Sequence, residues 1–220
     1  MQITGMLWGR KLLDLVEYPH SEVRGPELSV DEIKDMIKRH GQVFIKPLFK
    51  GGVGKKGKAG LLGRVDNISD ALKEKERLYF AEHVDGFSKV KSDGVTYEGA
   101  VTADFEVYFS ISESTEHRCP VMTITHHGGI DIEELGDDKM KVVPFDALTG
   151  LKAFHVSNAL MELGAPPAVI SPLVQNLPKL WDLYNNYGMM MLELNPIRMQ
   201  PGKGGRLAPI ACDFKCAFDQ

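Results

Sequence analysis

Glycine and lysine residues gather in one stretch of the chain, and their chemistry suits an anionic ligand. Six glycines and five lysines lie between Lys46 and Gly63. Glycine permits backbone conformations in which several N–H groups point at one phosphate, and lysine adds a mobile positive charge. The stretch therefore predicts phosphate binding, although a solvated hairpin tip would have the same composition.

Residues 52–58, GVGKKGK, also fit the consensus G-x-x-x-x-G-K of a P-loop. A P-loop continues with serine or threonine, which holds magnesium, and with a helix whose N-terminus faces the phosphate. Here Ala59 follows, and after it comes the strand-like segment LLGRV. We therefore reject the P-loop and expect a β-hairpin that closes over a nucleotide.

Three polar residues near the end of the chain suit a metal ion and the chemistry beside it. Glu193 and Asn195 are two residues apart in LELNPI, so an extended strand would present both on one face. Asp213 lies in the next strand-like segment, and pairing of the two strands would bring it near Asn195. Oxygen donors suit Mg²⁺, which keeps several waters. The alternative is that Asn195 caps the turn at Pro196 and Asp213 is exposed at a strand end.

The segments that must position these groups alternate between helical and extended patterns. We expect helices over 6–16, 29–41, 67–84, 150–164 and 171–188. Ser29 and Glu32 have the spacing of a capping box, and Pro178 is expected to kink the last helix. We expect strands over 43–46, 60–65, 104–112, 119–125, 189–195 and 206–215, and a turn and strand over 92–101. This order predicts an α+β fold with two lobes rather than a doubly wound sheet.

Composition excludes several classes of protein. The net charge of the 220-residue chain is −4, so we expect no nucleic-acid partner. Its three cysteines, Cys119, Cys212 and Cys216, imply no disulfide framework and favour a reducing compartment. The N-terminal segment has neither the basic nor the long apolar region of a signal peptide, and no apolar run could span a membrane. We therefore expect a cytoplasmic protein.

Seven segments, in order along nearly the whole chain, resemble one family: VFIKP, KKGKAGLLG, YEGAVTADFEVYFSI, HHGGIDIEEL, PFDALTG, LELNPI and CDFK. Together they resemble the ATP-grasp region of the β subunit of succinate–CoA ligase. They equally resemble the same region of ATP-citrate lyase and citryl-CoA synthetase. The resemblance implies a two-lobed ATP-grasp fold that clasps a nucleotide, with a small lobe over 22–98 and a large lobe over 1–21 and 99–220.

The resemblance also implies which residues contact the phosphates of the nucleotide, ATP or GTP. Lys46 would reach them from the small lobe. Lys55, Lys56 and Gly57 would form the loop that closes over them, although the stretch that leads to this loop from Lys46 is longer than in the family.

Further residues match the parts of the family that bind the rest of the nucleotide. Glu98, together with the backbone near Val101, would lie at the hinge between the lobes against the adenine. Glu106 would bind the nucleotide near its ribose. In the family the segment before GGIDIE carries a glutamate, whereas here His127 occupies that position.

The resemblance implies that Asn195 and Asp213 hold Mg²⁺ and that Glu193 is catalytic. Glu193 would face a phosphohistidine carried by a partner α subunit or domain, which also holds the coenzyme A site. In such enzymes ATP phosphorylates that histidine, the phosphate passes to a carboxylate such as succinate or citrate, and coenzyme A displaces the acyl phosphate. The implied activity is that of an ADP-forming acid–CoA ligase or of an ATP-citrate lyase component.

Two other functions fit the same nucleotide-binding residues. One is an ATP-grasp ligase that joins a carboxylate to an amine without a histidine intermediate. The other is a module that binds nucleotide but has lost turnover. The family continues after the position of Asp213 into a flavodoxin-like domain, which is absent here, so we expect a fragment or split subunit that does not complete acyl-CoA synthesis alone.

Overall fold

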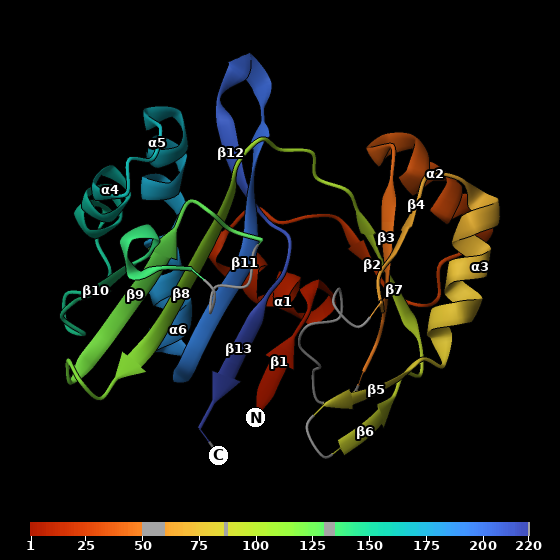
Figure 1. Cartoon of the computed structure of the whole chain (residues 1–220), viewed down its shortest axis with the longest axis horizontal. Helices are drawn as coiled ribbons and strands as arrows, with labels where there is room; N and C mark the ends of the chain where they lie inside the picture. Colours follow the sequence, from red (N-terminus) through yellow and green to blue (C-terminus); the bar gives the residue numbers. More distant parts are fainter. Residues whose placement is uncertain (50–59, 86–87, 130–134, 220) are drawn as a thin grey trace. The chain divides into compact units, whose positions relative to one another are not determined.

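The computed structural model describes residues 1–49, 60–85, 88–129 and 135–219, and the chain forms two compact units (Figure 1). The large unit comprises Met1–His20 and Thr102–Gln220, and the small unit comprises Ser21–Val101. Each unit contains helices and an antiparallel sheet, which confirms the predicted α+β class.

The small unit contains a four-stranded antiparallel sheet, two helices and a separate two-stranded sheet. The four strands follow the order β2 (Val23–Arg24), β7 (Val95–Gly99), β3 (Val43–Pro47) and β4 (Gly63–Val65). Helices α2 (Val30–His40) and α3 (Ile68–Tyr79) bury apolar side chains in a core shared with β3 and β7. The pairing of Val43 with Val65 and of Ile45 with Gly63 confirms the predicted hairpin around the glycine-rich stretch.

Helix α2 begins and ends where the sequence predicts. The Ser29 side chain accepts the N–H of Glu32 at 3.4 Å, and the Glu32 carboxylate accepts the N–H of Ser29 at 2.9 Å. These reciprocal bonds satisfy two N–H groups that have no partner inside the helix. Gly41, at a φ of 72°, ends the helix.

The predicted helix over 67–84 is wrong in its last third. Helix α3 ends at Tyr79, and β5 (Glu82–Asp85) then pairs with β6 (Ser88–Lys91). An ion pair at 2.6 Å between Glu82 and Lys89 joins the two strands diagonally. Pairing of β5 with β6 satisfies the backbone hydrogen bonds that a longer helix would have made. This pairing cannot be seen in the local sequence pattern.

The large unit contains a seven-stranded antiparallel sheet. Its order is β1 (Gln2–Thr4), β13 (Lys215–Phe218), β11 (Met189–Pro201), β8 (Glu106–Ser114), β9 (Cys119–Thr125) and β10 (Lys141–Pro144), and β12 (Leu207–Ala211) also pairs with β11. The helices are α1 (Met6–Leu13), α4 (Ala153–Glu162), α5 (Pro167–Asn176) and α6 (Lys179–Asn186), with 3₁₀ turns at η1 (Asp14–Val16), η3 (Asp137–Lys139) and η4 (Lys203–Gly205).

The two faces of this sheet differ in polarity. Phe109 is paired with Leu194 and Ile111 with Leu192, and all four side chains are fully buried. Helix α6 lies on this face, because its Tyr184 hydroxyl donates to Glu113, two residues beyond Ile111, at 3.1 Å. The opposite face carries polar side chains, which include the predicted catalytic residue.

The predicted helix over 171–188 is wrong in its extent, because Pro178 divides it. Helix α5 ends at Asn176, and Pro178 caps the start of α6. Proline lacks the N–H that would continue the first helix, but it suits the start of the second one. Within the described residues, no helix is both long enough and apolar enough to cross a membrane.

Candidate functional site

The predicted metal ligands Asn195 and Asp213 lie in one gap of the large unit's sheet. Strand β11 pairs with β12 at Ile197–Ala211 and with β13 at Glu193–Lys215. Asn195 and Asp213 are the midpoints of the two segments between these pairs. The N–H of Cys212 donates to the carbonyl of Pro196 at 2.9 Å and so holds the two segments together.

The single strand predicted over 206–215 is wrong, and the break is what places Asp213. The chain leaves β12 at Ala211 and enters β13 at Lys215, so Asp213 is outside the regular ladder. Its Oδ1 accepts the N–H of its neighbour Phe214 at 2.9 Å. This bond fixes one carboxylate oxygen and leaves the other available to a ligand.

Asn195 lies in a β-bulge of β11. Pairing with β8 passes from Leu194–Phe109 to Ile197–Val107, so β11 has one more residue than its partner strand. The Asn195 Oδ1 accepts the N–H of Gly129 at 3.2 Å. A carbonyl oxygen has two lone pairs, so Oδ1 can still bind a cation.

The donor chemistry of this gap fits magnesium. A carboxylate and an amide oxygen are hard ligands, and Mg²⁺ is usually held by one or two such groups together with waters and phosphate oxygens. Over the described ranges, no group of three or more histidine, cysteine, aspartate or glutamate side chains is placed to hold a metal ion. The two residues thus suit an ion that a bound phosphate helps to hold.

Glu193 lies on the polar face of the sheet beside this gap. It is paired with Ser110 on one side and Lys215 on the other, and the Tyr108 hydroxyl donates to its Oε2 at 3.4 Å. Burial raises the pKa of Glu193 against the lowering effects of Lys215 and of the Tyr108 hydrogen bond, and Asp213 raises it further. The side chain can therefore accept and orient a donor such as an imidazole N–H.

Glu106 forms an ion pair across the same sheet. Its carboxylate lies 2.6 Å from the Arg198 guanidinium, and the two residues are directly opposite in the register of β8 and β11. The Glu106 carbonyl accepts the N–H of Gly128 at 2.8 Å. The residue that the sequence predicts for the ribose is thus oriented by Arg198, which the sequence analysis did not single out.

In the small unit, the predicted phosphate ligand and the predicted hinge residue are ion-paired. The Lys46 Nζ lies 2.6 Å from the Glu98 carboxylate, across the paired strands β3 and β7. The two side chains are 20% and 6% exposed, so the pair is largely removed from solvent. Val101, also predicted at the hinge, is the last residue of the small unit and is buried.

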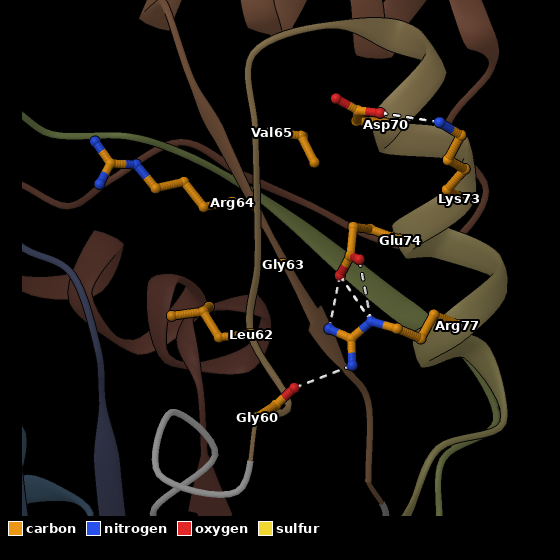
Figure 2. A pocket seen from close by; sticks show the side chains of 9 residues that line it. All are labelled: Gly60, Leu62, Gly63, Arg64, Val65, Asp70, Lys73, Glu74 and Arg77. Carbon is orange, nitrogen blue, oxygen red and sulfur yellow. Dashed lines mark hydrogen bonds and ion pairs between the residues drawn. The ribbon is translucent and has the colours of Figure 1, made fainter.

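The predicted phosphate loop residues Lys55, Lys56 and Gly57 lie outside the described residues. After them, the chain is anchored at Gly60, whose carbonyl accepts from Arg77 at 3.0 Å (Figure 2). Arg77 also contacts Glu74 at 2.6 Å.

These residues line a pocket of about 390 Å³ beside β4 and α3, and Figure 2 shows its lining side chains. Both Arg77 and Lys73 lie beside carboxylates there, the latter at 3.3 Å from Asp70. We therefore do not assign the pocket to phosphate.

Sequence reasoning missed four residues of the large unit's site: Tyr108, Gly129, Arg198 and Lys215. Tyr108 and Arg198 had a usable signal, because alternation places Tyr108 on the same strand face as Glu106 and because Arg198 follows LELNPI closely. Lys215 is two residues from Asp213. The hydrogen bond from Gly129 to Asn195 depends on the bulge at Asn195, and no local sequence pattern predicts that bulge.

Comparison with known proteins identifies the fold. A family model described as an ATP-grasp domain matches residues 16–199. The β subunit of ADP-forming succinate–CoA ligase from Desulfatibacillum aliphaticivorans is 30% identical over 200 residues, which cover 88% of this chain and 51% of that protein. The chain thus spans about half the length of this curated relative.

Two solved structures are similar over the whole chain. ATP citrate lyase from Methanothrix soehngenii, in complex with citrate and coenzyme A, has a TM-score of 0.69 and 19% identity over 100% of this chain and 52% of that one. A dinucleotide-forming acetyl-coenzyme A synthetase of Ca. Korarchaeum cryptofilum, in complex with ligands that include coenzyme A and Ca-AMPCP, has a TM-score of 0.73 and 14% identity over 99% and 93%. With the family match, these likenesses confirm the predicted ATP-grasp fold.

Proposed function

This chain belongs to the ATP-grasp domain family, and from that membership we propose that it binds ATP or GTP with Mg²⁺ and donates a phosphoryl group. The reaction would be that of an ADP-forming acid–CoA ligase or of ATP-citrate lyase. The observation that carries the proposal is the gap between β12 and β13, where Asn195 and Asp213 offer oxygen donors beside Glu193. The similarity to a succinate–CoA ligase β subunit supports the same reading.

We propose nucleotide-binding roles for the following residues of each unit. The small unit would supply Lys46 for the phosphates, Glu98 and the Val101 backbone for the adenine, and the segment with Lys55, Lys56 and Gly57. The large unit would supply Glu106 near the ribose, oriented by Arg198. Phosphoryl transfer depends on positioning and on neutralisation of charge more than on covalent chemistry by the protein.

Asn195 and Asp213 would hold the metal, and Glu193 would hold the phosphoryl acceptor. Bound Mg²⁺ would neutralise charge on the phosphate oxygens. Glu193, supported by Tyr108, would accept the N–H of a partner histidine and so aim its other ring nitrogen at the terminal phosphorus. The P–N bond would form as the P–O bond between the terminal phosphorus and the nucleoside diphosphate breaks, and ADP or GDP would leave with that oxygen.

The histidine belongs, in this proposal, to a partner α subunit or domain that also binds coenzyme A. The acid that then receives the phosphate would be a carboxylate such as succinate or citrate. We propose a cytoplasmic location for this complex, with no nucleic acid or membrane involved.

The first test is titration calorimetry of ATP with magnesium into the 220-residue chain and into Asp213→Ala. We expect binding that requires magnesium and is weakened by the substitution. The matched control is Asp182→Asn, which removes a charge from an exposed position on α6. Unchanged binding by Asp213→Ala would remove the metal site from this gap.

The second test adds a histidine-bearing α subunit from a succinate–CoA ligase and γ-labelled ATP. Acid-labile label on that subunit, lost with Glu193→Ala, supports phosphohistidine formation. Phosphate release that depends on an amine, without labelled histidine, would favour the carboxylate–amine ligase instead. Binding without any transfer would favour a nucleotide-binding module.

A further inference from the structure

We propose that Gly9, in the first helix, is a positioning residue for Asp213. The inference rests on the proposed function, because it concerns the metal ligand assigned there. The two residues are far apart in sequence, but α1 lies against the segment that connects β12 to β13. Because position 9 has no side chain, α1 can lie close to this segment.

Gly9 is buried against Phe214, the residue that follows Asp213. A methyl group at position 9 would lie 2.5 Å from Cγ and 2.8 Å from Cδ1 of Phe214, and closer still to its Cβ. Cβ is attached directly to the backbone, so rotation of the Phe214 side chain cannot relieve the contact. Phe214 itself is 1% exposed and has no room to move outward without repacking.

Two hydrogen bonds, one between backbone groups and one from a backbone N–H to a side chain, extend this contact to the carboxylate. The N–H of Gly5, just before α1, donates to the Phe214 carbonyl at 2.7 Å. The N–H of Phe214 donates to the Asp213 Oδ1 at 2.9 Å. Gly5 and Gly9 thus hold Phe214 from two directions, and Phe214 holds the Asp213 side chain.

The other end of the segment is fixed to the residue that follows the second proposed metal ligand. The Cys212 N–H donates to the carbonyl of Pro196, the residue after Asn195, at 2.9 Å. Asp213 is therefore held between Pro196 and helix α1. A displacement of Phe214 by α1 would change the separation of Asp213 from Asn195 while leaving both side chains chemically intact.

Helix formation alone would favour a different residue at this position. Glycine in the interior of a helix is less favourable than alanine, because it loses more backbone freedom. Replacing Gly9 with alanine should therefore strengthen α1 in isolation. Any loss of metal affinity in that variant would have to come from the contact with Phe214.

The test measures Mn²⁺ binding to the 220-residue chain in the presence of ADP, from the EPR signal of the free ion. Gly9→Ala should weaken Mn²⁺ binding by about tenfold, the lower end of the range for residues that orient metal ligands. ADP binding in EDTA should be unchanged. Trp8→Ala is the matched control, because its side chain is 49% exposed on the same helix and should leave Mn²⁺ affinity at the wild-type value.

The outcomes separate this inference from the proposed function. If the wild type binds Mn²⁺, Asp213→Ala does not and Gly9→Ala equals the wild type, the positioning role of Gly9 is wrong and the metal site stands. If the wild type binds no Mn²⁺, or Asp213→Ala binds it normally, the proposed metal site fails and this inference fails with it. If Gly9→Ala weakened ADP binding in EDTA as much as it weakened Mn²⁺ binding, the substitution would have damaged the fold in general. That result would also overturn the positioning role of Gly9.

A second variant covers the case in which Gly9→Ala does not fold. Phe214→Leu keeps the Cβ, Cγ and Cδ1 positions that face Gly9 but removes the rest of the buried ring, so it loosens the packing that holds Phe214 against α1. We expect a smaller loss of Mn²⁺ affinity, with ADP binding in EDTA retained. Wild-type Mn²⁺ affinity in a folded Phe214→Leu chain would contradict the proposal.

Discussion

The Nζ of Lys46 lies 2.6 Å from the Oε2 of Glu98 in the small unit, on the sheet face opposite the apolar core that holds Ile45 and Tyr97. One residue is proposed to bind phosphates and the other to lie by the adenine, yet they form one largely buried ion pair. A lysine ammonium has three donors, so contact with one carboxylate does not by itself prevent Lys46 from contacting a phosphate as well. The carboxylate fixes the direction of the lysine side chain before any nucleotide binds.

Removal of the lysine alone should therefore be costly. Lys46→Met deprives the 6%-exposed Glu98 of this cation, and we expect a loss of about 2–4 kcal/mol in the free energy of unfolding. Urea denaturation followed by circular dichroism measures it. Nucleotide affinity, measured by calorimetry under native conditions, should also fall.

The double variant Lys46→Met/Glu98→Gln separates these two effects. Neutralising both members removes the buried charge that the single variant deprives of Lys46, so most of the lost stability should return. Nucleotide binding should stay weak, because no cation remains at position 46. If the double variant recovered nucleotide affinity together with stability, Lys46 would have a structural role alone.

Glu193 should show the opposite relation between stability and activity. Burial raises the pKa of its carboxyl group, which means that the charged form is held at a cost. Glu193→Gln keeps the shape and removes that charge, so we expect stability at neutral pH to rise by up to about 1 kcal/mol. Differential scanning calorimetry should show a higher Tm, while phosphoryl transfer to the partner histidine is lost.

Ser110→Ala is the comparison for that experiment. Ser110 is paired with Glu193 on the same face and is 6% exposed, but it carries no charge. A Tm increase with Ser110→Ala, and none with Glu193→Gln, would mean that packing rather than charge limits stability on this face.

Local signals predicted the elements whose partners are close in sequence. The capping box at Ser29 and Glu32 located α2, and the alternation from Phe105 to Ile111 located β8 and its hairpin with β9. Segments whose secondary structure depends on contacts with distant residues were not predictable from local sequence. The segment after Tyr79 fits a helix locally, but it pairs as β5 with β6.

The candidate site divides in the same way. The two-residue spacing predicted one strand face for Glu193 and Asn195, and the expected pairing with the following strand predicted that Asp213 would lie near Asn195. The break between β12 and β13, which places Asp213 outside the ladder, was not predicted. The bulge that lets Asn195 contact Gly129 and the packing of Gly9 on Phe214 depend on residues 66 and 205 positions apart. Such long-range contacts are set by tertiary packing. The sequence gives a single indication of the contact between Gly9 and Phe214, which is a glycine inside a helix.

Glu22 links the strand β2 to the end of α2 and should make the small unit sensitive to acid. Its carboxylate accepts from Arg39 and His40 at 2.8 Å and from Arg24 at 3.2 Å. Burial opposes ionisation, but the hydrogen bonds from His40, Arg39 and Arg24 lower the pKa of Glu22 to about 2. The interaction is therefore present above the ordinary glutamate pKa and is lost as the pH falls towards 2.

Comparison of the wild type with Glu22→Gln tests this dependence. At pH 7 the wild type should be more stable by about 1–2 kcal/mol, a value reduced by solvent screening. The difference should shrink between about pH 4.5 and pH 2 in urea titrations at low salt. Glu27→Gln, at an exposed position before the same helix, should show no such trend. A difference that is constant over this pH range would mean that Glu22 acts through shape and not through charge.

The amide oxygen of Asn195 accepts from the Gly129 N–H and is also proposed to bind magnesium. Asn195→Asp keeps an acceptor of the same shape and adds a second negative charge beside Asp213. Without metal the two carboxylates repel each other, so the Tm in EDTA should fall below that of the wild type. Magnesium with ADP should raise the Tm of this variant by more than it raises that of the wild type, because the cation relieves the repulsion.

Asn195→Ala should instead respond little to magnesium, since it loses the ligand and leaves the Gly129 N–H without this acceptor. Asn158→Asp, at an exposed position on α4, controls for the added charge and should keep the magnesium response of the wild type. Thermal scans with ADP in EDTA and in magnesium distinguish all four proteins. If Asn195→Asp showed the same low Tm with and without magnesium, the gap between β12 and β13 would not hold the metal.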